Sequence, residues 1–161
     1  MRGSTLTTTP YAEGLALLAR REFSVAQLRE RLHRKELDKD AVELALYRLQ
    51  QEGALDDRRT AAVYARRAIL VNCRGPRRVT QEIEATGIDK TIAHAVVSEF
   101  CAEVDADELL QRALNRRLNG PVQNRAQLRR LYKYLFRQGF EGSKIIDALR
   151  THSNAETMLN E

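Results

Sequence analysis

The sequence predicts an all-α protein, built from three tandem three-helix repeats that form an elongated, curved array. Three observations lead to this prediction. Residues that favour helices, chiefly Ala, Leu, Arg, Glu and Gln, dominate the 161 residues. No segment of useful length alternates apolar and polar residues as a half-buried strand does. An apolar pattern also recurs three times at a period of about 50 residues, which is typical of repeat proteins.

The repeated pattern is a set of three apolar residues separated by four and then five positions. The first two are one helical turn apart, and the third follows the end of the helix. Gly87 and Gly139 precede the third residue in two sets, where glycine is common after a helix, and Glu36 takes that place in the first set. The sets begin 51 and 52 residues apart: Leu28, Leu32 and Leu37; Val79, Ile83 and Ile88; Leu131, Leu135 and Phe140.

Each set marks the second helix of a repeat, with one helix before it and one after it. The first helices end in paired arginines, at 20–21, 66–67 and 116–117. The third helices are lined by Val42, Leu46 and Leu49, by Ile92, Val96 and Phe100, and by Ile145 and Leu149. The predicted domains are a disordered tail over residues 1–10, repeat 1 over 11–56, repeat 2 over 57–104, repeat 3 over 105–152 and a flexible tail over 153–161.

Local signals predict where helices begin. Ser24 and Gln27 have the spacing of a capping box ahead of the second helix of repeat 1. Asp56 and Asp57 precede a helix that begins near Arg58; we interpret them as a helix cap, with a paired-carboxylate site as the alternative. Gly-Pro pairs at 75–76 and 120–121 are each expected to break the chain and open the next helix.

Positive charge is concentrated in the second and third repeats. The chain carries a net charge of +5, divided as zero over residues 1–56, +2 over 57–104 and +3 over 105–161. No acid occurs in residues 58–81 or 109–140, although surface helices usually mix both signs. A solvated helix face is the simplest explanation of a charge run, but these acid-free blocks favour an anionic partner. The candidate binding residues are Arg66, Arg67, Arg77, Arg78, Arg112, Arg116, Arg117, Arg125, Arg129, Arg130, Lys133 and Arg137.

Arg77 and Arg78 are the most unusual of these cations. They are expected in the first turn of a helix, where the helix dipole is already positive, so helix stability does not explain them. We therefore expect Arg66, Arg67, Arg77, Arg78, Arg129, Arg130 and Lys133 to form one discontinuous strip that contacts a partner, and their removal to leave the fold intact or slightly more stable. Tyr132, Tyr134 and Phe136 lie among the later cations and could stack on bases, although some of them are expected in the core.

No catalytic or metal-binding pattern is present. His33, His94 and His152 fall in different repeats, and no P-loop, dinucleotide fingerprint, HExxH or CxxC motif occurs. Cys73 and Cys101 are expected to be small buried residues of a reduced, cytoplasmic protein. The longest apolar runs are too short to span a membrane, and no cofactor is expected.

These stretches together resemble the RecX family of regulatory proteins, which modulate the RecA recombinase. The resemblance rests on "LLARREFSVAQLRERL", on "GALDD" followed by Arg59, on "GPRRVTQEIEATGI" and on "LRRLYKYLFRQGFEGSKIIDAL", in this order over residues 11–150. Glu36, Ala54 and Thr60 depart from the family pattern at packing positions. The resemblance implies a non-enzymatic monomer that lies in the groove of RecA–DNA filaments, bridges protomers and inhibits RecA's ATPase, strand exchange and coprotease activities. A stand-alone DNA-binding helical module is the alternative, and an enzyme is the least favoured.

Overall fold

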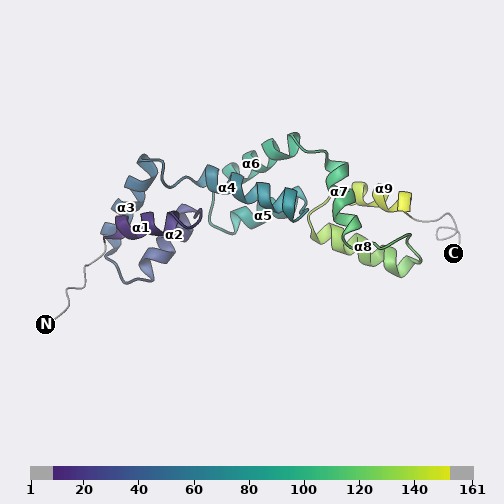
Figure 1. The fold of residues 1–161 in the computed structure, drawn as a ribbon, viewed down its shortest axis with the longest axis horizontal. Coiled ribbons are helices and arrows are strands. Elements are labelled where there is room, and N and C mark those ends of the chain that lie inside the picture. The colour runs from purple at the N-terminus through teal and green to yellow at the C-terminus, as the bar shows by residue number, and fades with distance from the viewer. Residues whose placement is uncertain (1–8, 153–161) are drawn as a thin grey trace.

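The computed structural model describes residues 9–152, and this part of the chain is all-α, without a β-sheet. Nine α-helices and one short π-helix, labelled η1, follow in series (Figure 1). Their bounds are α1 (Pro10–Leu18), α2 (Val25–His33), α3 (Lys39–Gln51), α4 (Asp57–Arg66), η1 (Arg67–Val71), α5 (Pro76–Glu84), α6 (Lys90–Ala102), α7 (Ala106–Asn115), α8 (Arg125–Arg137) and α9 (Gly142–His152).

The helices are arranged in three successive groups along an elongated, gently curved molecule, with α1–α3 at one end and α7–α9 at the other (Figure 1). Helices α1–α3 lie in repeat 1, α4–α6 in repeat 2 and α7–α9 in repeat 3. The predicted fold class is therefore confirmed. Thr9 and Pro10 correct the predicted tail, because the Thr9 hydroxyl caps α1 and Pro10 is its first residue. Residues 1–8 and 153–161 of the two predicted tails lie outside the described part of the chain.

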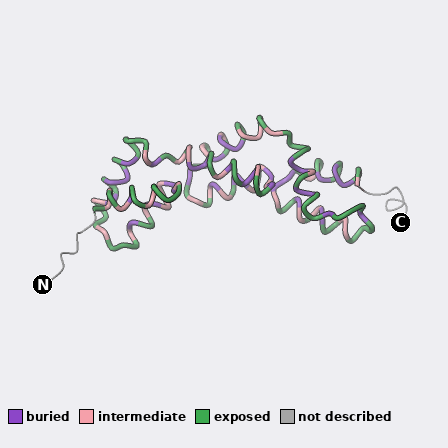
Figure 2. The backbone as a smooth tube through the Cα atoms, viewed as in Figure 1, coloured by how far each residue is buried: buried purple, intermediate pink, exposed green. Residues whose placement is uncertain are grey.

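Buried residues alternate with exposed ones along the helices of all three repeats (Figure 2). All six residues of the helical pairs are buried: Leu28, Leu32, Val79, Ile83, Leu131 and Leu135. Repeat 1 has a separate core cluster, whereas the buried residues of repeats 2 and 3 form one continuous cluster. The joint between repeats 2 and 3 is thus part of a hydrophobic core.

Most of the predicted helix starts are present. Ser24 and Gln27 form the capping box of α2, and the Asp56 carboxylate accepts the backbone N–H groups of Arg58 and Arg59 at the start of α4. Gly75 and Pro76 open α5. Asp57 has a different partner, since its carboxylate accepts the N–H of Val25 at 2.8 Å and so ties repeat 2 to the start of α2.

The prediction that Gly120-Pro121 opens a helix is wrong. Helix α8 begins at Arg125, because the Asn124 side chain accepts the Gln127 N–H at 2.8 Å and caps the helix there. The segment between α7 and α8 is held instead through Val122, which is buried and donates its N–H to the His152 carbonyl at 3.2 Å. Helix α8 has 13 residues, whereas α2 and α5, the second helices of the earlier repeats, have nine each.

The two joints between repeats use the same contact. Gly87 and Gly139 both have positive φ angles, +84° and +94°, in the turn after the second helix of their repeat. A β-carbon on Gly87 would overlap Ala26, in the first turn of α2, and one on Gly139 would overlap Arg78, in the first turn of α5. A hydrogen bond accompanies each contact: the Ser24 hydroxyl donates to the Thr86 carbonyl at 2.5 Å, and the Gly75 N–H donates to the Gln138 carbonyl at 2.7 Å.

Candidate functional site

Arg77 and Arg78 lie in the first turn of α5, as predicted, and both contact repeat 3. The Arg78 guanidinium donates to the Glu82 carboxylate at 2.9 Å and to the Gln138 side-chain oxygen at 3.1 Å. The Arg77 guanidinium lies 4.3 Å from the centre of the Phe136 ring. The unfavourable position relative to the helix dipole is thus offset within the chain itself, by contacts across the joint.

Two more of the candidate arginines join repeats 2 and 3. Arg112 and Arg116 on α7 donate to the carbonyls of Leu70 at 2.7 Å and Val71 at 2.5 Å, which end the π-helix η1. Cations are favourable at this end of a helix, because its last carbonyls lack partners and carry partial negative charge. The two side chains therefore contribute to the joint as well as to the surface charge.

Arg66 and Arg117 pack on aromatic rings. The Arg66 guanidinium lies 5.9 Å from the Phe100 ring centre, and that of Arg117 lies 4.6 Å from the Tyr134 ring centre. Both arginines are exposed, so their charges still face solvent. Arg67, also exposed, has no ion pair within residues 9–152.

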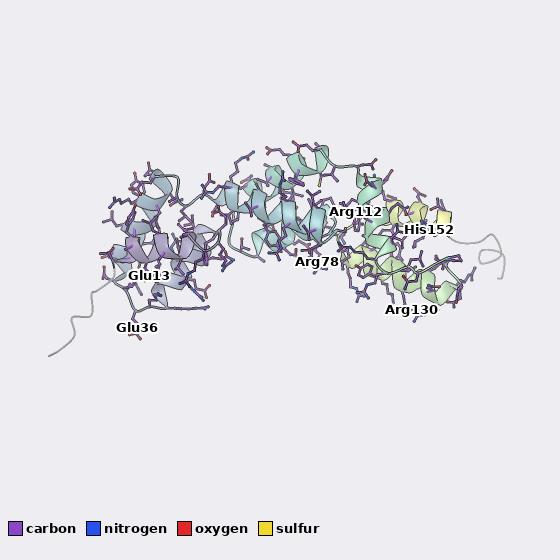
Figure 3. All side chains as sticks on the ribbon, viewed as in Figure 1. Glu13, Glu36, Arg78, Arg112, Arg130 and His152 are labelled. Carbon is purple, nitrogen blue, oxygen red and sulfur yellow. The ribbon has the colours of Figure 1, made fainter. Side chains whose placement is uncertain are left out.

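The remaining candidates occupy one side of α8, which we name the cationic face of α8; it consists of Arg125, Arg129, Arg130, Lys133 and Arg137. All five side chains are exposed, and Arg130 lies at the lower edge of the molecule in Figure 3. Arg130 donates to the Ala126 carbonyl of its own helix at 3.3 Å. The other four have no ion pair or hydrogen bond of their side chains within the described residues. This face therefore presents positive charge that the described chain does not neutralise.

Repeat 1 uses its cations differently. Arg29 pairs with Glu43 at 2.6 Å and Arg48 with Glu52 at 2.8 Å. Arg34 pairs with Glu30 and Lys35 with Glu13. Surface pairs of this kind contribute little to stability, but they neutralise the local field. Four acids of repeat 1 thus pair with its cations, whereas the described acids of repeat 3 form no ion pair with α8. The positive charge on α8 therefore reflects the structure as well as the composition.

An aromatic side chain is exposed beside the cationic face. Phe136 is 40% exposed, and its ring stacks on Tyr132 with the ring centres 6.0 Å apart and the planes 13° from parallel. Tyr132 and Tyr134 are half-buried. Phe136 is therefore more exposed than Tyr132 or Tyr134, the other two candidates for base stacking.

No catalytic arrangement appears among the described residues. The cavity where repeats 2 and 3 meet has a volume of about 340 Å³ and a mainly apolar lining, including Val104, Leu109 and Phe140. Burial raises the pKa of the Cys101 thiol beside it, which keeps the sulfur protonated. The three histidines have separate surroundings, and residues 9–152 contain no cluster of three metal-ligating side chains.

No protein-family model matches the chain, but individual proteins do. A regulatory protein RecX from Syntrophotalea carbinolica is 31% identical over 136 residues, which cover 83% of this chain and 89% of that protein. A second, from Xanthomonas campestris pv. campestris, is 34% identical over 144 residues, covering 88% of this chain and 86% of the relative. The chain belongs to the RecX family.

Solved RecX structures have the same fold. The crystal structure of RecX from Lactobacillus salivarius matches with a TM-score of 0.70 at 17% identity, covering 88% of this chain and 93% of that one. Another regulatory protein RecX matches with a TM-score of 0.72 at 23% identity, over 88% of this chain and 70% of the other. The family resemblance is therefore confirmed, and membership of a family of regulatory proteins confirms that the chain is not an enzyme.

The candidate cations were chosen from the sequence, but their intramolecular partners were not predicted. Gln138 and Glu82 bind Arg78: Glu82 is one helical turn away within the same helix, whereas nothing in the sequence near Arg78 indicates Gln138. No feature of the sequence predicts the π-helix η1, whose last carbonyls accept hydrogen bonds from Arg112 and Arg116. One signal was available, because the spacing of Arg125, Arg129, Lys133 and Arg137 by four residues places them along one side of a helix.

Proposed function

We propose that this chain binds RecA–DNA filaments in the filament groove and inhibits RecA's ATPase, strand-exchange and coprotease activities. The observation that carries the proposal is the relationship to regulatory RecX proteins over more than four fifths of the chain. That relationship gives the class of protein, and RecA is the partner that the family resemblance implies. The details of the encounter are inferred from the shape and charge of this chain.

The shape supports binding along a groove. Three repeats in series present a long, gently curved surface rather than a compact one (Figure 1). Repeat arrays commonly use such extended surfaces to contact several partner subunits at once. An elongated molecule of this kind is suited to bridging neighbouring protomers of a helical filament.

The charge supports the same partner. A nucleoprotein filament offers protein carboxylates and DNA phosphates, and the cationic face of α8 is available to either. The arginines at the joint between repeats 2 and 3 have intramolecular partners, so they are weaker candidates for direct contact than the prediction assumed. We therefore assign the main contact to α8.

The test is RecA ATPase activity on single-stranded DNA at substoichiometric amounts of this protein. The parent should inhibit, and Arg129→Gln with Lys133→Gln should inhibit at least about tenfold less effectively, as expected for a loss of about 1.4 kcal/mol. The matched control is Arg20→Gln with Arg31→Gln, two exposed repeat 1 arginines without an ion pair in the described residues. An unchanged ATPase rate at every ratio would rule out the proposed function.

A stand-alone DNA-binding module remains the second candidate, favoured by the unneutralised charge on α8. It predicts DNA binding that falls steeply with salt and no effect on RecA beyond competition for DNA. A monomeric, cytoplasmic protein stays a prediction under both functions. No helix within residues 9–152 is long and apolar enough to cross a membrane.

A further inference from the structure

Four cations of α8 form a row along the helix. Arg125, Arg129, Lys133 and Arg137 are separated by four residues each, a rise of about 6 Å per step at 1.5 Å per residue. The row therefore extends over about 18 Å, turning slowly around the helix. Evenly spaced charges of one sign match a linear polyanion, in which phosphates recur along the strand.

An acidic protein surface fits this row less well. Protein surfaces mix both signs, so a protein partner usually meets a face that also carries acids. The cationic face has none, since residues 109–140 contain no Asp or Glu. No Asp or Glu from another part of residues 9–152 pairs with it either. The row thus carries only positive charges over about three helical turns, which suits a phosphate backbone.

The exposed ring of Phe136 adds a second kind of contact. Phe136 is three residues from Lys133 and seven from Arg129, so it lies on the same side of the helix as the row. Its ring belongs to a stack that includes Tyr132 and the Arg77 guanidinium. Bases stack on aromatic rings and on guanidinium planes, and carboxylates have no such preference. In a duplex the faces of the bases are covered by their neighbours, so this contact requires an unpaired base.

We propose that the cationic face of α8 and the Phe136 stack bind single-stranded nucleic acid directly: Arg125, Arg129, Lys133 and Arg137 contact successive phosphates, and one unpaired base packs against the stack. The inference rests on the proposed function only for its setting in the filament, because the contact itself needs no RecA. In that setting the third repeat holds the DNA strand while the rest of the array contacts protein.

The test is fluorescence anisotropy of a labelled oligothymidylate of about 20 nucleotides, longer than common single-strand sites, titrated with the full chain without RecA. The parent should bind it more tightly than a duplex of the same length. Arg129→Gln with Lys133→Gln should weaken binding about tenfold or more and reduce the slope of log affinity against log salt by about 1.4, the value for two lost phosphate contacts. The Arg20→Gln, Arg31→Gln protein is the control and should retain the parent slope and affinity to within about twofold.

Phe136→Leu separates stacking from charge. Leucine keeps an apolar side chain but has no ring, so affinity should fall about fivefold or more with the salt slope unchanged. A cooperative thermal transition, lowered only by the lost ring contacts with Tyr132 and Arg77, shows that the variant remains folded. Equal affinity of this variant and the parent would overturn the stacking contact, and equal affinity for single strand and duplex would overturn the preference for unpaired bases.

Parallel RecA ATPase assays distinguish this inference from the proposed function. A parent that inhibits RecA but does not bind the oligothymidylate would overturn the inference and leave the function standing. If the α8 variant also lost inhibition in that case, α8 would contact RecA carboxylates instead. A parent that binds the oligothymidylate but never affects RecA would support the inference and overturn the proposed function.

Discussion

Gly139 lies against the first turn of α5, so close that a β-carbon on the glycine would come within 2.6 Å of the Arg78 β-carbon. Its φ of +94° is also a conformation that side chains other than glycine rarely adopt. The same relationship holds between Gly87 and Ala26 at the other joint. The glycines predicted as simple helix ends are therefore also the points where one repeat touches the next.

Gly139→Ala should lower the free energy of unfolding by about 2–5 kcal/mol, from the left-handed backbone and the overlap with Arg78 together. Urea denaturation measures the loss. Gly53→Ala is the matched control, because Gly53 has a φ of +70° but open space around it. That variant should lose only about 1–2 kcal/mol. Equal losses in the two proteins would show that the joint adapts to a side chain.

The repeated apolar residues should be the main source of stability. Leu135→Ala should cost about 2–5 kcal/mol in urea denaturation, because Leu135 is fully buried and its removal leaves a cavity. Leu44→Ala, at a leucine that is 70% exposed, should change stability by less than about 0.5 kcal/mol. Losses below about 1 kcal/mol at most of the six buried positions would contradict the repeat alignment.

Arg78→Ala should destabilise the protein, contrary to the expectation from sequence that removing this charge is harmless. The variant loses the ion pair with Glu82 and the hydrogen bond to Gln138, for about 1–2 kcal/mol by thermal or urea unfolding. Arg129→Ala removes an exposed cation of α8 without such contacts and should leave stability within about 0.5 kcal/mol of the parent. An Arg78→Ala protein as stable as the Arg129→Ala protein would restore the original expectation.

Glu82 should make stability depend on pH. Burial acts to raise its pKa, but hydrogen bonds from Arg78 and Tyr64 and the charges of Arg74 and Arg78 outweigh it and lower the pKa below its usual range. A carboxylate whose pKa is depressed in the folded state stabilises the fold above its unfolded pKa, about 4.3, and this contribution is lost as pH falls through the folded value.

Glu82→Gln should therefore be less stable than the parent at pH 7, and the difference should shrink as the pH falls below about 4. Urea unfolding of both proteins across this range measures it. Glu103→Gln is the control, since Glu103 is exposed and has no ion pair in residues 9–152. A difference that stays constant with pH would mean that the Glu82 charge has no role.

Small-angle scattering should show an elongated monomer. A compact globule of this length has a radius of gyration of about 15 Å. Three repeats in series exceed that value, so the measured radius should be clearly larger and independent of protein concentration. A radius near about 15 Å would contradict the extended arrangement, and one that rises with concentration would contradict the monomer.

Helix starts that depend on a few neighbouring residues could be predicted from the sequence. The Ser24–Gln27 capping box, the Asp56 cap and the Gly75-Pro76 helix start each depend on neighbours in the chain, and all three are present. Gly120-Pro121 failed as a signal because Asn124, four residues after the glycine, is the stronger cap. A Gly-Pro pair therefore marks a helix start only when no stronger cap follows within a few residues.

Contacts between repeats could not be predicted in the same way. Phe136 and Gln138, the partners of Arg77 and Arg78 in repeat 3, lie about 60 residues further along the chain, and only the packed joint brings them together. Counting charges therefore treated all twelve candidate cations alike, although the structure uses several of them internally. The row of cations on α8 could have been predicted from the sequence, because its members share one helix and no acid lies near them in the chain.

The glycine contact at the joints also bears on assembly. At both joints, the glycine turn of one repeat packs against the first turn of the second helix in the preceding repeat. A head-to-tail contact of this kind, if it does not close into a ring, can propagate into an open fibre. Both outer ends of this array lack the contact. Glu36, with a φ of +55°, occupies the place of the joint glycines in repeat 1, and its side chain obstructs a close approach. In repeat 3 the residue equivalent to Gly75 is Gln127. It lies inside the longer α8, and its N–H is already bonded to the Asn124 side chain. One molecule therefore cannot bind another through the contact that joins its own repeats. The contact does not propagate from molecule to molecule into a fibre.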